Sequence, residues 1–390
     1  MISPRVQGVK PSATLQITAR AKALRAAGKG VVSLGAGEPD FDTPSHIKEA
    51  LVKALREKFI YYTPSTGIPE LKKAIAEKLE TENNIPCTES EVIVTPGAKQ
   101  ALHEAVFAVT DQGDEVICPD PGWVSYEPMV QLAGGKPVFV PAREEDGFAF
   151  NIEEVQEKMS DKTRAMIINT PCNPTGAVLA GSILKGMADL CVDHDIIAIS
   201  DEIYEKIIYE GEHVSMASLP DMKDRTITVN GFSKAYSMTG WRLGYAAGPV
   251  EIIRAMTKVQ SHSVSCATSF VQKAGVAALT SPQDEVGKMV AEFGRRRDTL
   301  MKLLAEIEGV SCVQPMGAFY AFPNFKRYGE DSFELAGYLL EEAGVAMIPG
   351  AAFGGNGEGF QRLSYATSMD NIERALERMK KALEKRSVSI

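Results

Sequence analysis

The sequence lacks the features that mark several large protein classes. It has no apolar run of transmembrane length, and its first residues lack the long apolar core of a signal peptide. With 51 acidic and 42 basic side chains the net charge is −9, which argues against nucleic acid or an anionic membrane as main partner. We therefore expect a cytoplasmic protein that binds small molecules.

Motifs for metals, disulfides and nucleotides are absent as well. The six cysteines form no CxxC pair and the five histidines no HExxH motif, so we expect neither a metal site nor a disulfide framework. Neither GxGxxG nor the phosphate-loop pattern occurs, which disfavours a nucleotide-binding protein.

From about residue 91, short runs rich in valine and isoleucine alternate with helical patterns. These runs are EVIVTPG, DEVICPD, KPVFVPA, RAMIINT, IIAIS, TITVNGF and RLGYAAG. The alternation predicts an α/β fold with a parallel sheet covered by helices on both faces.

After about residue 285 the pattern changes to a long helix, three short strand-like runs and a final amphipathic helix over 370–386. The length of 390 residues predicts two domains, and we expect this α+β end piece to pack with the N-terminal segment. The arginines at 295–297 are interpreted as an exposed helix face.

Ligands of such sheets bind beyond the carboxyl ends of the strands. The segments expected there are TPGAKQ, DPGWVSY, NTPCNPTG, SDEIYE and NGFSK, which are rich in Gly, Pro, Asn and Asp. The first of them joins a strand to a helix N-terminus, which is either an anion site or an ordinary turn.

Lys234 follows one of the predicted strands, and Arg242 lies eight residues further on. A buried lysine has a lowered pKa and serves as a Schiff-base nucleophile, whereas an arginine suits a phosphate. Together they suggest pyridoxal phosphate as cofactor. The alternative is that Lys234 is an ordinary solvated lysine.

Other strand ends offer partners for such a cofactor. Asp201 could pair with a protonated pyridine nitrogen or cap a helix, and Tyr204 lies within reach of the same site. Asn173 could donate a hydrogen bond or form an Asn-Pro turn, and Trp123 could stack on a ring or belong to the core. Arg362, in an apolar stretch, needs an anion such as a substrate carboxylate.

Six segments together resemble the class I aminotransferases of the fold-type I pyridoxal-phosphate enzymes, in order and spacing, over nearly the whole chain. They are SLGAGEPDFDTP, YYTPSTGIPELKKAI, NTPCNPTG, SDEIYE, GFSKAYSMTGWRLGY and QRLSYATS. KPSAT and GAKQAL look like the Iβ branch of the aspartate aminotransferases.

The resemblance implies the fold of this family and a homodimer with active sites at the subunit interface. A large domain, residues 41–299, would hold a mostly parallel seven-stranded sheet between helices. Residues 1–40 and 300–390 would form a smaller α+β domain that closes over the substrate.

The resemblance also assigns roles in catalysis. Lys234 would bind the cofactor aldehyde and shuttle the proton. Asp201 would keep the pyridine nitrogen protonated. Asn173 and Tyr204 would hydrogen-bond the ring oxygen and lower the pKa of the imine, and Trp123 would stack on the ring.

The phosphate would be held by four residues of one subunit and one tyrosine of the other: Gly97, Ala98, Lys99, Arg242 and Tyr62. Some relatives bind it with a further hydroxyl at the position of Gly231, and Ser233 is the candidate replacement.

The substrate α-carboxylate would bind Arg362, helped by the backbone at Gly37, with Trp123 and Asn173 beside it. Lys99, Ser12 and Thr14 would bind a distal carboxylate, and Lys10 would add charge for a larger dicarboxylate such as prephenate.

The implied reaction is ping-pong transamination between L-aspartate and 2-oxoglutarate, giving oxaloacetate and L-glutamate, with prephenate as a further amino acceptor. An aromatic or broad-specificity aminotransferase is the alternative. A non-catalytic binding protein is disfavoured because Lys234, Asp201 and Arg362 are all present.

Overall fold

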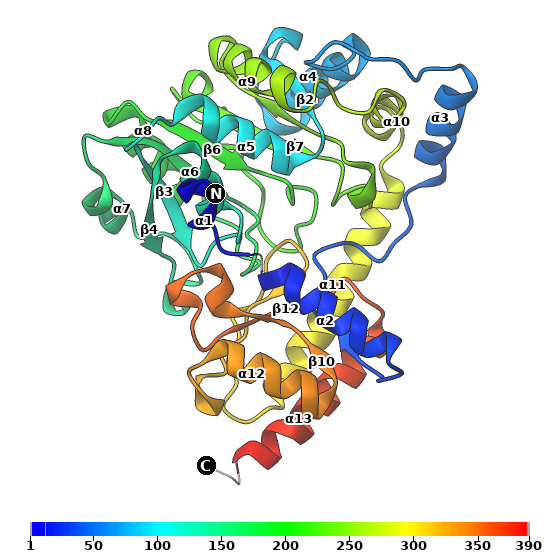
Figure 1. The fold of residues 1–390 in the computed structure, drawn as a ribbon, viewed down its shortest axis with the longest axis vertical. Coiled ribbons are helices and arrows are strands. Elements are labelled where there is room, and N and C mark those ends of the chain that lie inside the picture. Colours follow the sequence, from blue (N-terminus) through cyan, green and yellow to red (C-terminus); the bar gives the residue numbers. More distant parts are fainter. Residues whose placement is uncertain (1, 12, 388–390) are drawn as a thin grey trace.

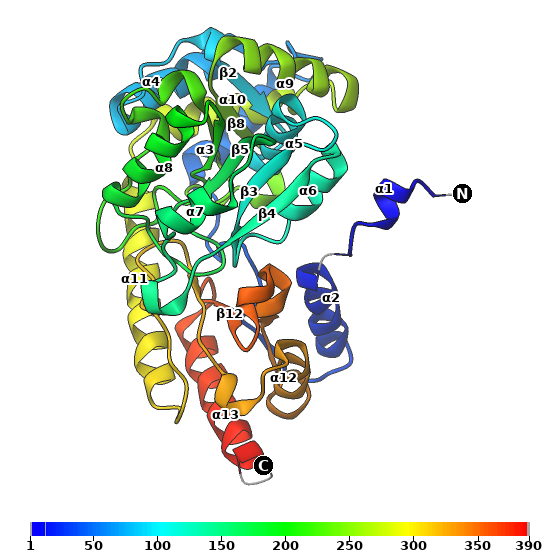
Figure 2. The ribbon, with the colours of Figure 1, turned by 90° about the vertical axis from the view of Figure 1, so that its left-hand side faces the viewer.

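The computed structural model describes residues 2–11 and 13–387. Figure 1 shows a sheet with its helices at the top and a smaller body below that contains the C-terminal helix. Helix α1 (Pro4–Gln7) projects from the side of the molecule, as Figure 2 shows. No helix in the described ranges combines the length and apolarity needed to cross a membrane.

The upper body is built on a seven-stranded sheet of order β2-β8-β7-β6-β5-β3-β4. β8 alone runs opposite to the other six strands, which share one direction. The mostly parallel sheet predicted from the sequence is thereby confirmed. Its strands are β2 (Val92–Thr95), β3 (Glu115–Asp120), β4 (Lys136–Pro141), β5 (Thr163–Asn169), β6 (Ile197–Asp201), β7 (Thr226–Gly231) and β8 (Gly244–Ala247).

Helices cover both faces because successive strand residues point to opposite sides. On β5, Ile167 packs in the core under α5, α6 and α9, whereas Met166 and Ile168 pack in the core under α7 and α8. A third core joins α3, α4 and α10 to β2 and β8. These helices are α3 (Ser45–Arg56), α4 (Pro69–Asn83), α5 (Ala98–Val109), α6 (Tyr126–Ala133), α7 (Ile152–Lys158), α8 (Gly181–Asp193), α9 (Val250–Ser263) and α10 (Ser269–Thr280).

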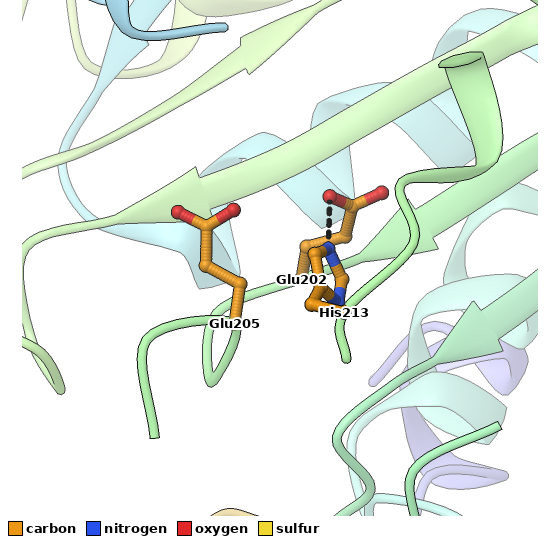
Figure 3. Close-up of side chains that lie close together, drawn as sticks. All are labelled: Glu202, Glu205 and His213. Atoms are coloured by element: carbon orange, nitrogen blue, oxygen red, sulfur yellow. Dashed lines mark hydrogen bonds and ion pairs between the residues drawn. The ribbon is translucent and has the colours of Figure 1, made fainter. Parts of the chain in front are cut away.

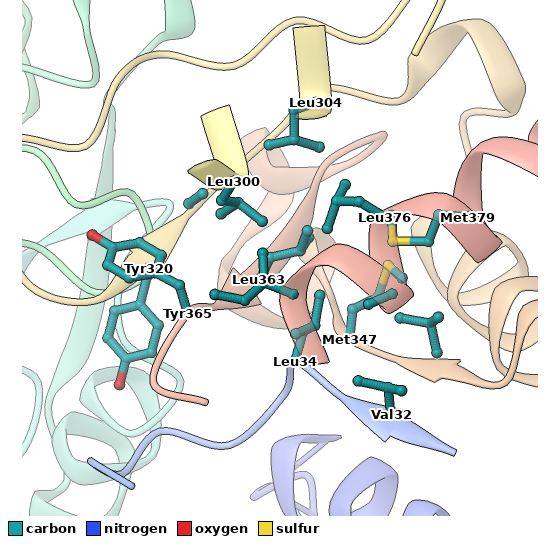
Figure 4. Packing of buried hydrophobic residues seen from close by; sticks show 14 of the residues in the cluster. Val32, Leu34, Leu300, Leu304, Tyr320, Met347, Leu363, Tyr365, Leu376 and Met379 are labelled. Carbon is teal, nitrogen blue, oxygen red and sulfur yellow. The ribbon is translucent and has the colours of Figure 1, made fainter. Parts of the chain in front are cut away.

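The lower body joins the two ends of the chain. β1 (Val32–Ser33) pairs in parallel with β10 (Val345–Ala346), so the N-terminal segment packs there, as expected. A three-stranded sheet has the order β11-β12-β9, and one apolar core, drawn in Figure 4, fills this body. The remaining elements are α2 (Ala13–Ala26), α11 (Asp284–Ala305), β9 (Tyr320–Ala321), α12 (Ser332–Tyr338), β11 (Ile348–Pro349), β12 (Gln361–Ser364) and α13 (Met369–Ser387).

Helix α11 runs without a break through the predicted domain boundary at residue 299. The boundaries themselves, at residues 40 and 299, stay predictions. The interpretation of 295–297 as an exposed face is wrong for two of the three arginines, since Arg296 and Arg297 are only 6% and 7% exposed. Arg296 pairs with Asp40 at 2.6 Å, because an arginine can bury its stem when its charged end has a partner.

The side chains at the end of β6 and just after it point in two directions. Asp201 and Tyr204 face the cavity described below, whereas Glu202 and Glu205 take part in a buried polar cluster (Figure 3). Glu202 accepts hydrogen bonds from Ser200 at 2.8 Å and Ser215 at 2.6 Å, and its Oε2 lies 2.8 Å from Nε2 of His213.

Glu205 is bound from helix α4. It forms a buried ion pair with Lys78 and accepts a 2.7 Å hydrogen bond from Nδ2 of Asn83. Ligand atoms of Glu202, Glu205 and His213 all lie within 4.8 Å of one another, a spacing that a metal ion could use. Because Lys78 already neutralises Glu205 and the oxygens of Glu202 are occupied, we interpret the cluster as an anchor for the Asp201–Tyr204 segment.

Replacement of Lys78 tests this anchor. Burial alone would raise the pKa of Glu205, but Lys78, His213 and Asn83 hold it below its usual range. In Lys78→Met the carboxylate stays buried without its cation, so the free energy of unfolding should fall by about 3–5 kcal/mol near neutral pH. Urea denaturation followed by circular dichroism measures this loss.

The pH dependence and a matched variant complete the experiment. The stabilisation from a lowered carboxyl pKa is lost as pH falls through that pKa, so the difference between the two proteins should shrink in acid. Lys73→Met, on the same helix, removes only an exposed pair with Glu77 and should cost less than about 1 kcal/mol. Equal losses in both variants would contradict the anchor.

Candidate active site

One large cavity, of about 410 Å³, opens at the carboxyl ends of the parallel strands, between the two bodies. Most of the site residues predicted from the sequence line it: Thr14, Gly37, Ala98, Lys99, Trp123, Asn173, Asp201, Tyr204, Lys234, Arg242 and Arg362. Segments from many parts of the chain therefore meet at one place, as the topology of a parallel sheet requires.

Lys234 lies three residues beyond β7, and its ammonium donates a hydrogen bond to the carbonyl of Gly37. Its Nζ is 5.8 Å from the ring centre of Tyr204 and 5.7 Å from that of Phe319. Burial, and next the charge of Arg362, lower the pKa of Lys234 to about 8. With this pKa about a tenth of the amine is unprotonated at pH 7, far more than for an ordinary lysine, and can attack a carbonyl carbon.

Asp201 ends β6 and is buried. It accepts hydrogen bonds from the hydroxyl of Tyr126 at 2.7 Å and from the backbone N–H of Ile203 at 3.3 Å. The segment after it forms a turn, not a helix, so the helix-cap alternative is wrong. Burial raises the pKa of Asp201 to about 6, and a cation placed beside it would lower that pKa again.

Arg362 carries a buried charge on β12. Its Nη1 donates to Oδ1 of Asn173 at 2.9 Å and its Nη2 to the carbonyl of Gly35 at 2.8 Å. The guanidinium lies 4.4 Å from the ring centre of Tyr320, and its Nε is buried with no hydrogen-bond partner in residues 2–11 and 13–387. Among the described residues no carboxylate pairs with it, so an anion entering the cavity meets a preformed cationic site.

The N-terminus of α5 faces the guanidinium of Arg242. Within the described chain the N–H groups of Ala98 and Lys99 have no recorded acceptor, as expected for the first turn of a helix. Gly97 has φ 91°, and a Cβ there would lie 2.4 Å from Nη2 of Arg242. This close approach leaves a cradle of backbone donors and one arginine, which suits a phosphate.

Gly231 lies where β7 and β8 pack closely, which explains why this position holds a glycine. A Cβ on Gly231 would lie 2.9 Å from Cα of Gly244 on β8, so a serine or threonine hydroxyl does not fit there without a shift. Ser233 is buried and lines the cavity. Its role as a replacement hydroxyl stays a prediction.

The part of the cavity near helix α2 carries hydroxyls and one amine. Among the described residues Thr14 Oγ1 is buried without a hydrogen-bond partner, and Thr18 also lines the cavity. Nζ of Lys99 lies 4.8 Å from the ring centre of Trp123. Burial, and next Arg242, lower the pKa of Lys99.

The predicted residues that do not line the cavity fall into three cases. Lys10 is exposed, and Ser12 lies outside the described residues. Gly97 is not among the residues that line the cavity, but it lies against the guanidinium of Arg242. Tyr62 is 90% exposed, beside exposed Tyr61 and Ile60.

Sequence reasoning missed three residues of the site, Tyr126, Tyr320 and Thr18. Tyr126 and Tyr320 are buried, and each bonds a predicted site residue through its hydroxyl. The only available signal for Tyr126 was its position in DPGWVSY, and for Thr18 its position one helical turn after Thr14.

Comparisons with known proteins agree with this arrangement. The sequence model of the family described as aminotransferase class I and II matches residues 29–379. Aspartate aminotransferase of Bacillus subtilis (strain 168) is 48% identical over 393 residues, which cover 99% of this chain and 100% of that protein. Probable aspartate/prephenate aminotransferase of Aquifex aeolicus (strain VF5) is 49% identical over 390 residues, 98% of each chain.

Solved structures are equally similar. The aspartate aminotransferase from Thermus thermophilus with maleate has a TM-score of 0.95 and 45% sequence identity, covering 98% of this chain and 99% of that one. The fold type read from the sequence is confirmed, and so is the family that the sequence resembles.

The reactivity of Lys234 can be measured directly. Glyoxylate followed by borohydride should label it half-maximally near pH 8, because the free amine is the nucleophile and its fraction rises through the pKa of about 8. Peptide mass mapping over a pH series reads the labelling of each lysine in one sample. Lys288 is the internal control, since Glu285 raises its pKa and it should be labelled only at higher pH. Labelling curves with the same midpoint pH for the two lysines would contradict the lowered pKa of Lys234.

Proposed function

This chain belongs to the aminotransferase class I and II family, and we propose that it transfers the amino group of L-aspartate to 2-oxoglutarate with pyridoxal phosphate as cofactor. The products are oxaloacetate and L-glutamate, formed by a ping-pong mechanism, and prephenate is a further amino acceptor. The observation that carries the proposal is one cavity that joins a low-pKa lysine, a buried aspartate and an arginine without a carboxylate partner.

The cavity fits pyridoxal phosphate on its own geometry. Gly97, the free N–H groups of Ala98 and Lys99, and Arg242 form a cradle for the phosphate at one end. Asp201 lines the cavity, where its carboxylate would pair with the pyridine nitrogen of the cofactor. Trp123 lines the cavity and offers a ring face for stacking.

When bound, pyridoxal phosphate supplies a protonated ring that withdraws electrons from the substrate α-carbon. Asp201 holds the proton on the ring nitrogen, because a pyridinium beside it favours the ionised carboxylate. Tyr126 keeps that carboxylate in place through its 2.7 Å hydrogen bond. Tyr204 and Asn173 donate hydrogen bonds to the ring oxygen.

Lys234 has two tasks in succession. Its free amine would hold the cofactor aldehyde, and Nζ, once released by the substrate amine, would act as the base that removes the proton from the substrate α-carbon and as the acid that delivers a proton to the acceptor carbon. The lowered pKa suits both tasks, since Nζ must be able to lose and regain a proton near neutral pH.

Arg362 binds the α-carboxylate of the substrate. Because Oδ1 of Asn173 accepts from Nη1 of Arg362, the amide NH₂ of Asn173 is left as a donor toward ring or substrate oxygen. The unpartnered Nε adds a further donor, and the backbone at Gly37 lies in the same wall.

The distal carboxylate of a dicarboxylic substrate binds at the α2 end of the cavity. Lys99 supplies the charge, and Thr14 supplies a buried hydroxyl that has no partner in the described part of the chain. Ser12 belongs to this subsite, and Lys10 adds charge for a longer dicarboxylate such as prephenate. A cationic pocket favours aspartate over apolar amino acids, because an unpaired buried charge is costly.

The active unit is proposed to be a cytoplasmic homodimer in which Tyr62 reaches the phosphate of the partner subunit. In support, Tyr62 is 90% exposed and lies next to exposed Tyr61 and Ile60, an apolar surface that a second copy would cover. Residues 41–299 form the cofactor domain, and residues 1–40 and 300–390 form the domain that closes over the substrate.

An absorbance spectrum tests cofactor and donor together. Purified protein supplied with pyridoxal phosphate should show a visible band that bleaches on addition of L-aspartate and returns with 2-oxoglutarate. Lys234→Ala should lose the half-reaction by several orders of magnitude, because no other amine lies at that position. A protein that takes up no cofactor would contradict the proposal.

Lys99→Met tests the substrate class. It should lower kcat/KM for L-aspartate at least about 30-fold, the factor that corresponds to about 2 kcal/mol for a truncated charge pair, and should change that for L-phenylalanine little. Cofactor affinity, measured by titration of the visible band, is the control for a phosphate role of Lys99. Equal losses on both amino acids would contradict the distal-carboxylate role and favour an aromatic or broad-specificity enzyme.

A further inference from the structure

We propose that Tyr320 is a positioning residue that links the arginine of the substrate carboxylate site to the phenol at the cofactor oxygen. Its hydroxyl lies 2.7 Å from that of Tyr204, and the guanidinium of Arg362 lies 4.4 Å from its ring centre. The inference rests on the proposed function, and it adds a residue whose hydroxyl acts through Tyr204.

Tyr320 connects the two bodies of the molecule. It lies on β9 of the lower body, where Ser364 of β12 is its strand partner, whereas Tyr204 follows β6 of the upper body. Both tyrosines are buried, at 1% and 4% exposure, and both line the cavity. The hydrogen bond between their hydroxyls therefore crosses from one body to the other inside the site.

The guanidinium beside the ring affects the hydroxyl of Tyr320. Burial raises the pKa of Tyr320, and the charge of Arg362 acts against this rise. A cation on the ring face withdraws electron density, so the hydroxyl becomes a stronger hydrogen-bond donor. An anion bound to Arg362 would cancel part of that effect.

Tyr320, Tyr204 and the cofactor oxygen form a chain of hydrogen bonds, which we call the relay. The number of hydroxyl protons sets its direction. Tyr204 has a single hydroxyl proton, which it gives to the ring oxygen when the cofactor is bound. Its oxygen can then only accept from Tyr320, so the proton of Tyr320 points to Tyr204. Hydrogen bonds in such a chain polarise one another, and Tyr204 becomes a better donor because Tyr320 donates to it.

The expected consequence is a lower pKa at Lys234 Nζ in the holoprotein. A strong hydrogen bond to the ring oxygen stabilises the form in which Nζ has lost its proton. The other charged groups that act on the two tyrosines or lie against them are Asp201, Glu38 and Lys234. They remain in place when the hydroxyl of Tyr320 is removed, so that variant isolates the relay.

Tyr320→Phe is the direct test, because it keeps the ring and its contact with Arg362. In holoprotein, the midpoint pH of the visible-band titration should rise by about half to one unit, the size expected for one hydrogen bond. Saturating maleate, an unreactive dicarboxylate, should raise the midpoint in the wild-type protein, and this rise should be smaller in the variant.

Tyr365→Phe is the matched control. Tyr365 belongs to the same buried cluster and appears with Tyr320 in Figure 4, but its hydroxyl donates a 3.4 Å bond to the carbonyl of Ala318 and interacts with the hydroxyl of Tyr209, and neither of these partners lines the cavity. Its titration midpoint should equal that of the wild-type protein. A shift as large as that of Tyr320→Phe would show a general effect of lost packing and would overturn the relay.

A double-variant cycle tests whether the effect passes through Tyr204. In the Tyr204→Phe background, Tyr320→Phe should add no further shift. An additional shift of full size, or an unchanged midpoint in the single variant Tyr320→Phe, overturns the inference while the proposed function stands. A wild-type protein without a visible band would instead refute the proposed function.

Discussion

The buried guanidinium of Arg362 is the constraint on which the site depends. Burial of an uncompensated charge is costly, and here the cost is reduced by Asn173, the carbonyl of Gly35 and the ring of Tyr320. These partners come from both bodies of the molecule. An anion completes the set, so the fold keeps a binding site ready at the expense of its own stability.

The parallel sheet provides the frame that brings these groups together. Its strands end at one edge, and each end delivers a residue with a separate task. The segment over residues 201–205 has side chains in two environments. Asp201 and Tyr204 face the cavity. Glu202 and Glu205 lie on the other side, where Ser215 and Lys78 bind them. The residues proposed for the reaction and the residues that anchor the segment thus lie on its opposite sides.

Much of this arrangement could be predicted from the sequence, because strand runs, helix periods and polar loop ends are local patterns. The seven strand runs correspond to β2 through β8, and the final helix expected over 370–386 is α13, Met369–Ser387. Tyr320 could not be found, since a tyrosine in an apolar run looks like core until its hydroxyl partner is known, and for Tyr126 only its strand-end segment DPGWVSY pointed to the site. Arg296 was misjudged for a related reason: its partner Asp40 is 256 positions away.

Helix α11 extends from the upper body of the molecule to the lower one. Its 22 residues make a rod of about 33 Å that begins beside the upper body and ends against α13 in the lower one. For a rod of that length, a tilt of about 5° at one end displaces the other by about 3 Å. A tilt of this size would therefore move the walls of the cavity, which lies between the two bodies, by about 3 Å relative to each other.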